Sequence, residues 1–251
     1  MNASVIRAKL SLLIRLIDTT TGAEVPESSV QFFAYGKEVR PSPRGAGNYV
    51  FINTVQEDFD LTVRAPGYEE MTKHVCFQEL DDHIPTVELF LIPSEKNRTG
   101  VILTLSGSLP SLEAVEAVNL FQPLCHISSY SEKTREMTVI RQGGRRLDVS
   151  YGHYGLLQAD SLGYEKLIVS GTDGAQTVTL KEPLTQPWTV NMQMMRVIYG
   201  SVDAEGNYLL RVRDDSRRLV FLVRYVVKGE VRFTQVDFHD PATLQLTQEA
   251  T

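Results

Sequence analysis

The sequence predicts a mainly β fold, and three observations carry this prediction. Apolar and polar residues alternate with a period of two through most apolar stretches, as they do in half-buried strands. Glycine, proline, asparagine and aspartate separate these stretches, which is typical of turns. The 251 residues are 42% hydrophobic and 22% charged, an ordinary globular composition that excludes a disordered chain, a collagen and a coiled coil.

The N-terminal third alternates most regularly. Its predicted strands are residues 10–17, 29–33, 48–52, 59–65 and 86–92. Residues 93–97 combine a proline with polar side chains and lack an apolar period, so we predict a domain boundary there. The predicted domains are residues 1–95, a β-rich domain over 98–187, and a β-rich segment over 188–251 that either stands alone or belongs to the second domain.

Several short motifs follow one another in residues 8–93. They are Asp18 with Thr21-Gly22, Val25-Pro26 with Val30 and Phe32, the run from Gly47 to Phe51, the run from Asp58 to Val63, and the run from Ala65 to Glu69. Their order resembles the carboxypeptidase-regulatory-like domain, a transthyretin-like β-sandwich. The family usually opens with Gly-x-Val, where this chain has Leu12 to Ile14. The resemblance implies a structural or interaction module without catalysis of its own.

Residues 111–121 form the best helix candidate. Ser111 can cap a helix, and Glu113 falls in the first turn, where the helix dipole favours an acid. Leu112, Val115 and Val118 share a stripe at helical spacing. A helix this short must pack on a sheet. We therefore predict one short helix inside the second, β-rich domain.

Strands return after this candidate helix. They are predicted over residues 125–130, 136–140, 145–151, 156–157, 167–169 and 177–180. Three more strands, over residues 207–213, 219–227 and 231–238, are predicted to form a meander near the end of the chain. Residues 219–223 are apolar on both faces, which predicts a central strand covered on both sides.

Charge and hydropathy limit the partners. The formal net charge is −6, and all of the acidic excess lies in residues 1–95. A nucleic-acid binder usually carries a basic excess over a domain, so we expect no nucleic-acid partner. No stretch of about 18 uncharged apolar residues exists, so we expect no membrane span.

The cysteines and the N-terminal residues predict a reducing compartment. Cys76 and Cys125 both lie in apolar, strand-like contexts, and we expect two reduced thiols in the core. Arg7, Lys9 and Arg15 interrupt the first apolar run, and no small-residue cleavage site follows, which disfavours a signal peptide. We therefore predict a cytoplasmic location.

Two groups of residues are candidates for contact with a ligand or partner. Trp188, with Tyr151 and Tyr154, has the aromatic surface to stack a sugar, although core packing is the commoner use of such residues. Arg217 and Arg218 belong to a basic cluster that also contains acidic residues, so local ion pairing competes with phosphate binding.

Catalytic and metal-binding signatures are weak. Asp237 and His239 would share one strand face, as two metal ligands should, but the adjacent Asp-Pro favours a plain strand end. Neither Gly-x-Ser-x-Gly nor His-Glu-x-x-His occurs in the sequence. We predict no catalytic residue, no metal and no cofactor.

The sequence thus predicts a non-enzymatic structural or adaptor subunit of a multi-protein assembly, in which sheet edges dock on neighbouring subunits as a homo- or hetero-oligomer. The whole chain is similar to accessory structural proteins of phage-tail-like contractile injection particles, a resemblance at the level of fold. The alternative is a carbohydrate-binding or other ligand-binding β module that uses Trp188. A third hypothesis, an enzyme with metal at Asp237 and His239, is less favoured.

Overall fold

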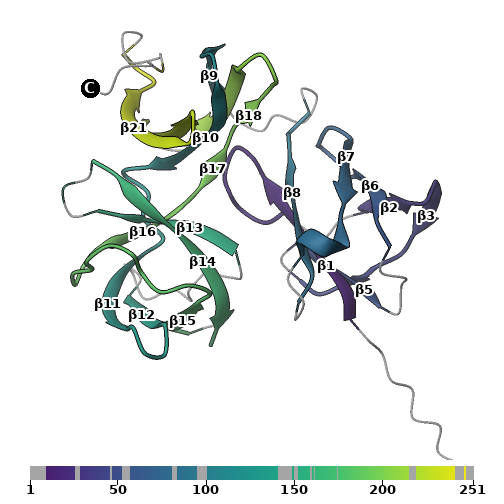
Figure 1. The fold of residues 1–251 in the computed structure, drawn as a ribbon, viewed down its shortest axis with the longest axis horizontal. Helices are drawn as coiled ribbons and strands as arrows, with labels where there is room; N and C mark the ends of the chain where they lie inside the picture. The colour runs from purple at the N-terminus through teal and green to yellow at the C-terminus, as the bar shows by residue number, and fades with distance from the viewer. Residues whose placement is uncertain are drawn as a thin grey trace, which may run out of the picture. The chain divides into compact units, whose positions relative to one another are not determined.

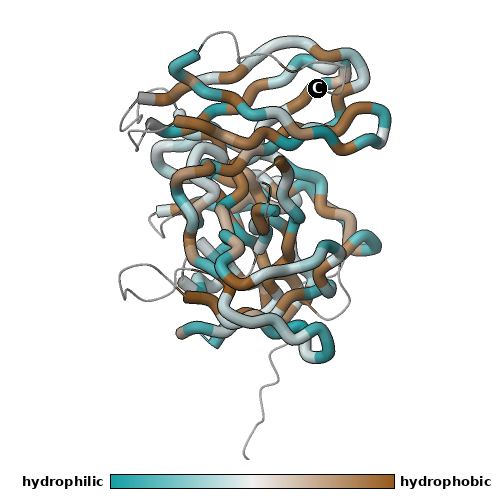
Figure 2. Tube along the Cα trace, turned by 90° about the vertical axis from the view of Figure 1, so that its left-hand side faces the viewer, coloured by the Kyte–Doolittle hydropathy of each residue, from teal (hydrophilic) through white to brown (hydrophobic). Residues whose placement is uncertain are grey.

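Strands make up nearly all of the regular structure, as the alternation predicts (Figure 1). The computed structural model describes residues 10–25, 29–45, 47–52, 57–80, 84–94, 101–140, 149, 152–158, 160, 162–173, 175–214, 219–240 and 246. The chain divides into two units, residues 1–99 and 100–251, each with its own buried core. Hydrophobic and hydrophilic residues alternate along the strands of both units (Figure 2).

The first unit is a sandwich of two four-stranded sheets. One sheet has the order β4 (Ser42–Pro43), β5 (Asn48–Ile52), β1 (Leu10–Asp18) and β8 (Thr86–Leu91), with β1 and β8 parallel. The other has the order β3 (Lys37–Val39), β2 (Gln31–Ala34), β6 (Phe59–Arg64) and β7 (Met71–Val75), all antiparallel. A 3₁₀ turn, η1 (Phe77–Glu79), follows β7. Leu12 and Ile14 of β1 share one buried core with Leu61 and Val63 of β6.

A buried aspartate ties the first turn of this sandwich to a later one. One carboxylate oxygen of Asp18 accepts hydrogen bonds from the backbone N–H and the hydroxyl of Thr20, at 2.7 and 2.6 Å, and from the backbone N–H of Thr21 at 3.1 Å. The other oxygen accepts the Tyr68 hydroxyl at 3.0 Å. Asp18 is only 4% exposed, so these bonds replace the water that its charge would otherwise bind. The Asp-Thr-Thr-Thr-Gly and Gly-Tyr motifs are thereby joined.

The second unit contains a closed six-stranded barrel. Its strands, in order around the barrel, are β11 (Cys125–Ser131), β12 (Glu136–Ile140), β15 (Thr177–Leu180), β14 (Tyr164–Thr172), β13 (Gly152–Leu157) and β16 (Gln193–Arg196). Cys125, Ile127 and Met137 are among the side chains that fill its interior. Cys125 is therefore a buried thiol outside any disulfide, whereas Cys76 in the first unit is only half-buried. Of the predicted strand over 145–151, only Val149 is among the described residues, and it is buried in the barrel core.

Two further sheets form a second sandwich in this unit. One has the order β17 (Ile198–Tyr199), β10 (Leu112–Asn119), β20 (Val220–Val227) and β21 (Glu230–Asp237), and the other has the order β18 (Ser201–Val202), β19 (Asn207–Asp214) and β9 (Val101–Ser108). Leu105, Val115, Leu210 and Val223 meet in the core between them. The barrel strands lie between β10 and β17 in the sequence, so the predicted division into 98–187 and 188–251 does not coincide with either core.

The predicted helix over 111–121 is wrong, because these residues form β10. Val115 and Ala117 point into the sandwich core, while Val118 packs on the opposite side of the sheet among residues of the barrel. A strand that is buried on both faces loses its alternation, and its apolar residues then also fit a helical stripe. Ser111 has a φ of 64°, which belongs to a turn and not to a helix cap.

The predicted three-stranded meander is also wrong. β20 and β21 do form a hairpin, and β20 is central as its apolar run predicts, but its second neighbour is β10. β19 pairs with β18 and β9 in the facing sheet. Successive strands pair in only about two-thirds of cases, and here β19 and β20 belong to facing sheets.

The barrel meets the second sandwich through an apolar contact with an ionic cluster beside it. Val118, Leu157, Tyr164, Met195, Val197 and Leu222 form the apolar part. Glu116 of β10 is 3% exposed and accepts from Lys166 Nζ of the barrel and from Arg224 Nη1 of β20, both at 2.8 Å. Burial, with the Glu116 charge, raises the pKa of Tyr164 well above its ordinary value.

Candidate interaction sites

The aromatic candidates belong to the barrel. Tyr154 of β13 is 6% exposed and forms part of the barrel core. Trp188 is half-buried against that core, with its ring edge-on to Tyr130 at a centroid distance of 6.2 Å. The Tyr130 hydroxyl accepts the backbone N–H of Leu184 at 3.1 Å, so this pair also holds the loop before β16. A carbohydrate role for Trp188 stays a prediction, which a glycan array comparing the native chain with Trp188→Ala would test.

The other candidates either lie in a turn or are not among the described residues. Tyr151, Arg217 and Arg218 lie outside the described residues. The backbone N–H of His239 donates to Asp237 Oδ1 at 2.9 Å, which closes a turn at the end of β21. Across the described part of the chain, no three His, Cys, Asp or Glu side chains are grouped so as to hold a metal ion.

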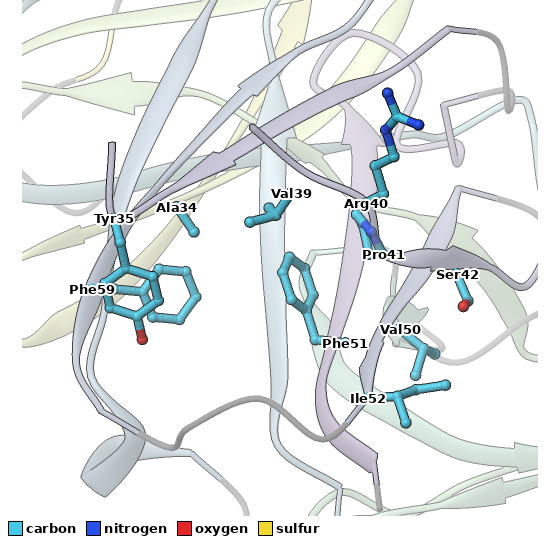
Figure 3. Close-up of a pocket in the computed structure, with 10 residues that line it drawn as sticks. All are labelled: Ala34, Tyr35, Val39, Arg40, Pro41, Ser42, Val50, Phe51, Ile52 and Phe59. Carbon is cyan, nitrogen blue, oxygen red and sulfur yellow. The ribbon is translucent and has the colours of Figure 1, made fainter. Parts of the chain in front are cut away.

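The first unit has a pocket of about 340 Å³ between its two sheets, beside β3 and β4 (Figure 3). Its lining residues come from β2 to β6 and are mainly apolar: Ala34, Tyr35, Val39, Arg40, Pro41, Ser42, Val50, Phe51, Ile52 and Phe59. Phe51 points into the centre of the pocket, whereas Arg40 extends away from the apolar side chains (Figure 3). This arrangement can accept a small apolar group.

Tyr35 forms one wall of this pocket and is 56% exposed. Its ring stacks on Phe59 at a centroid distance of 5.0 Å, and its hydroxyl donates to the main-chain carbonyl of Glu57 at 3.3 Å. Partial burial raises the pKa of the hydroxyl, and the negative charges of Glu57 and Asp58 raise it further by smaller amounts. Tyr35 therefore stays neutral at physiological pH and offers an apolar face.

The end strands of the sheets are the second kind of candidate, because an end strand leaves main-chain donors and acceptors open to another chain. Most end strands here are protected. β3, β4, β17 and β18 have only two or three residues each, and β4 contains Pro43. β7 and β21 carry charged side chains, and Lys73 of β7 donates to the main-chain carbonyl of Glu88 in β8 at 3.2 Å. Short length, proline and charge all discourage the pairing of edges.

β9 differs from these end strands. Its eight residues, Val-Ile-Leu-Thr-Leu-Ser-Gly-Ser, contain no charge and no proline, and they pair with β19 in an uninterrupted register. Thr104, Ser106 and Ser108 are exposed, while Leu105 is 1% exposed and anchors the strand in the core. The strand is thus long, regular and fixed in place, with one edge at the end of its sheet.

The register shows which main-chain groups face that open edge. Leu109, directly after β9, donates its N–H to the carbonyl of Gly206 at 2.9 Å. In an antiparallel pair, alternate residues exchange such bonds, so Leu103, Leu105 and Gly107 bond to β19. The N–H and C=O groups of Ile102, Thr104, Ser106 and Ser108 therefore point away from β19. Among the described residues, none of these groups has a hydrogen-bond partner.

The sequence analysis missed this strand, although its signal is present. Leu103 and Leu105 alternate with Thr104 and Ser106, which is the period of a half-buried strand. The alternation begins shortly after the polar boundary and ends at Gly107, so it covers only a few residues.

Comparison with known proteins adds no family. No protein-family model matches the sequence, and a search of curated proteins finds no significant match. Among the described residues, no helix is both long enough and apolar enough to cross a membrane.

Proposed function

We propose that the chain is a non-enzymatic structural or adaptor subunit of a multi-protein assembly, and that it docks on a neighbour by adding a strand to β9. The observation that carries this proposal is the edge of β9 with which no other described strand pairs, where the main-chain groups of four residues are directed outward and the strand has no charge and no proline. An extended segment that pairs there gains main-chain hydrogen bonds without any rearrangement of the sheet.

The N-terminal sandwich fits the same role. We propose that it is a transthyretin-like module of the carboxypeptidase-regulatory-like kind, and its support is the bond between Asp18 and Tyr68, which joins two of the motifs behind the resemblance. A phage-tail-like or contractile injection particle is the assembly that the whole-chain resemblance suggests. The cytoplasm is the compartment that we propose for it.

Site-specific photo-crosslinking in the cells that make the protein tests this function. A photoreactive amino acid at Ser108, which is exposed at the open edge of β9, is compared with the same group at Glu182, an exposed position in the loop after the barrel strand β15. We expect a defined adduct with another protein subunit from position 108 and none from position 182.

A second substitution separates edge pairing from chance proximity. Ser106→Pro removes one outward N–H but leaves the bonds of Leu105 and Gly107 to β19 in place. It should abolish the adduct, while Ser106→Ala should keep it. An adduct that survives Ser106→Pro, or the absence of any adduct from position 108, contradicts the proposed function.

A further inference from the structure

We propose that the segment docking on β9 is an extended, proline-free stretch of another protein with an acidic side chain opposite Thr104, where it meets Arg211. This inference rests on the proposed function and adds the chemistry of the partner. Its basis is the outer face of the sheet that contains β18, β19 and β9.

The outer face forms cross-strand rows. Arg211 of β19 lies opposite Thr104 of β9, and Leu209 lies opposite Ser106. A strand added to β9 would extend each row by one position, about 5 Å beyond β9 and about 10 Å from β19. An arginine side chain spans much of that distance when only small side chains lie between. Thr104 and Ser106 are small, so the Arg211 guanidinium can reach over β9 to a carboxylate on the added strand.

The charge of Arg211 has no counter-ion among the described residues of this face. Within the part of the chain that the structure describes, Arg211 makes no ion pair, and β9 supplies only uncharged side chains. Arg224, in the facing sheet, is by contrast bonded to the buried Glu116. Opposite charges in directly adjacent cross-strand positions contribute roughly 0.2–1 kcal/mol. A pair that reaches across β9 should contribute no more than this, which corresponds to at most about a fivefold change in affinity.

A second copy of the chain fits this face less well. The β9 strand of a second copy would bring isoleucine, threonine and serine to the added position and would leave Arg211 without an acid. A partner with glutamate or aspartate at that position gains the additional ion pair. Charge complementarity therefore favours a different protein over self-association.

Selection from a peptide library tests the inference. Ten-residue peptides, randomised at every position and displayed on phage, are selected on the intact chain, and those that also bind Ser106→Pro are discarded. The remaining peptides should lack proline and should carry Asp or Glu at an alternate position. Each is then synthesised with its acid and with the matching amide, and both affinities are measured.

We expect the acidic peptide to bind the native chain about two- to fivefold more tightly than its amide form, with a smaller difference at high salt. Arg211→Gln should make the two forms bind equally, whereas Arg232→Gln, on the end strand of the facing sheet, should leave the preference unchanged. Retained protection of the Leu103 and Leu105 amides from hydrogen exchange confirms that each variant is folded.

The possible failures are distinguishable. Ser106-dependent peptides without an acidic preference, or with a preference that survives Arg211→Gln, overturn this inference and leave the proposed function standing. A native dimer that Ser106→Pro converts to a monomer also overturns this inference and leaves the proposed function standing, because the strand added to β9 then comes from a second copy of the chain. If no peptide depends on Ser106, the docking edge itself is contradicted, and the proposed function fails with it.

Discussion

At the scale of single residues, two glycines of the first unit share a backbone conformation but differ in their surroundings. Gly47 and Gly36 have φ values of 67° and 70°. A Cβ atom at Gly47 would lie 2.9 Å from the main-chain oxygens of both Leu16 and Val25, whereas a Cβ atom at Gly36 would meet nothing within 4 Å. Position 47, beside β1, therefore requires a glycine for two reasons, whereas position 36, in the turn between β2 and β3, requires one for its backbone conformation alone.

We expect Gly36→Ala to lower the free energy of unfolding by about 1 kcal/mol, since it adds only the strain of a positive φ. Gly47→Ala should lower it by about 3 kcal/mol or more, because β1 must also shift. Urea denaturation of the two variants measures the difference. Equal losses would show that the close approach of Leu16 and Val25 to Gly47 is not a constraint.

Asp173, after β14, provides a second test at this scale. Its Oδ1 accepts the backbone N–H groups of Thr177, Ala175 and Gln176 at 2.8 to 2.9 Å. These bonds lower the pKa of Asp173 to about 2, and those from Thr177 and Ala175 contribute most. A carboxyl group whose pKa falls on folding stabilises the protein above its unfolded pKa, near 3.9, and loses that contribution as the pH drops towards 2.

Carbon-detected NMR titration should therefore find the midpoint of Asp173 near 2. Asp160, which also lies in a turn and, among the described residues, accepts a single backbone N–H, from Leu162, is the matched comparison. A midpoint for Asp173 near the ordinary value of an aspartate would mean that the three-donor turn does not persist in solution.

At the scale of elements, Glu116 fixes the contact between the barrel and β10. Replacement by glutamine keeps the shape but removes the charge that Lys166 and Arg224 share. Because removal of one partner of a buried ion pair leaves an uncompensated charge, we expect Glu116→Gln to cost about 3 kcal/mol. Glu136→Gln, an exposed position in β12, should change the stability by less than about 0.5 kcal/mol in the same denaturation experiment. A cost near zero at Glu116 would contradict the role of this cluster.

The errors of sequence-based prediction also arise at this scale. The strands with one more exposed face, such as β5, β6 and β12, are predictable because their period of two is undisturbed. β10 is not, since Val115 and Ala117 face one core while Glu116 and Val118 face the barrel. The alternation that identifies a strand disappears when both faces are buried.

At the scale of the whole molecule, the sequence predicts the β class and a polar stretch close to the division between the two units. It does not predict the order of strands in the second unit, because β9 and β10 precede the barrel while β17 to β21 follow it. Such long-range pairing leaves no local pattern. The candidate interaction surface was missed for a related reason. The edge of β9 is exposed to pairing because β9 lies at the end of its sheet, and that position is set by long-range pairing with β19.

Separate cores in the two units predict separate responses to mutation. Leu61 is fully buried in the first core, and Leu61→Ala should destabilise that unit by about 2–5 kcal/mol through the cavity it leaves. Amide hydrogen exchange should then accelerate in β1 and β6 but not in the barrel strands. Equal acceleration in the barrel would show that the two units unfold as one.

The open edge of β9 is the claim on which the proposed function depends, and amide hydrogen exchange along this strand tests it most directly. In dilute, isolated protein, we expect slow exchange for Leu103, Leu105 and Gly107, which bond to β19, and fast exchange for Ile102, Thr104, Ser106 and Ser108. Uniformly slow exchange along all of β9 would show that the edge is already covered, and would contradict the account.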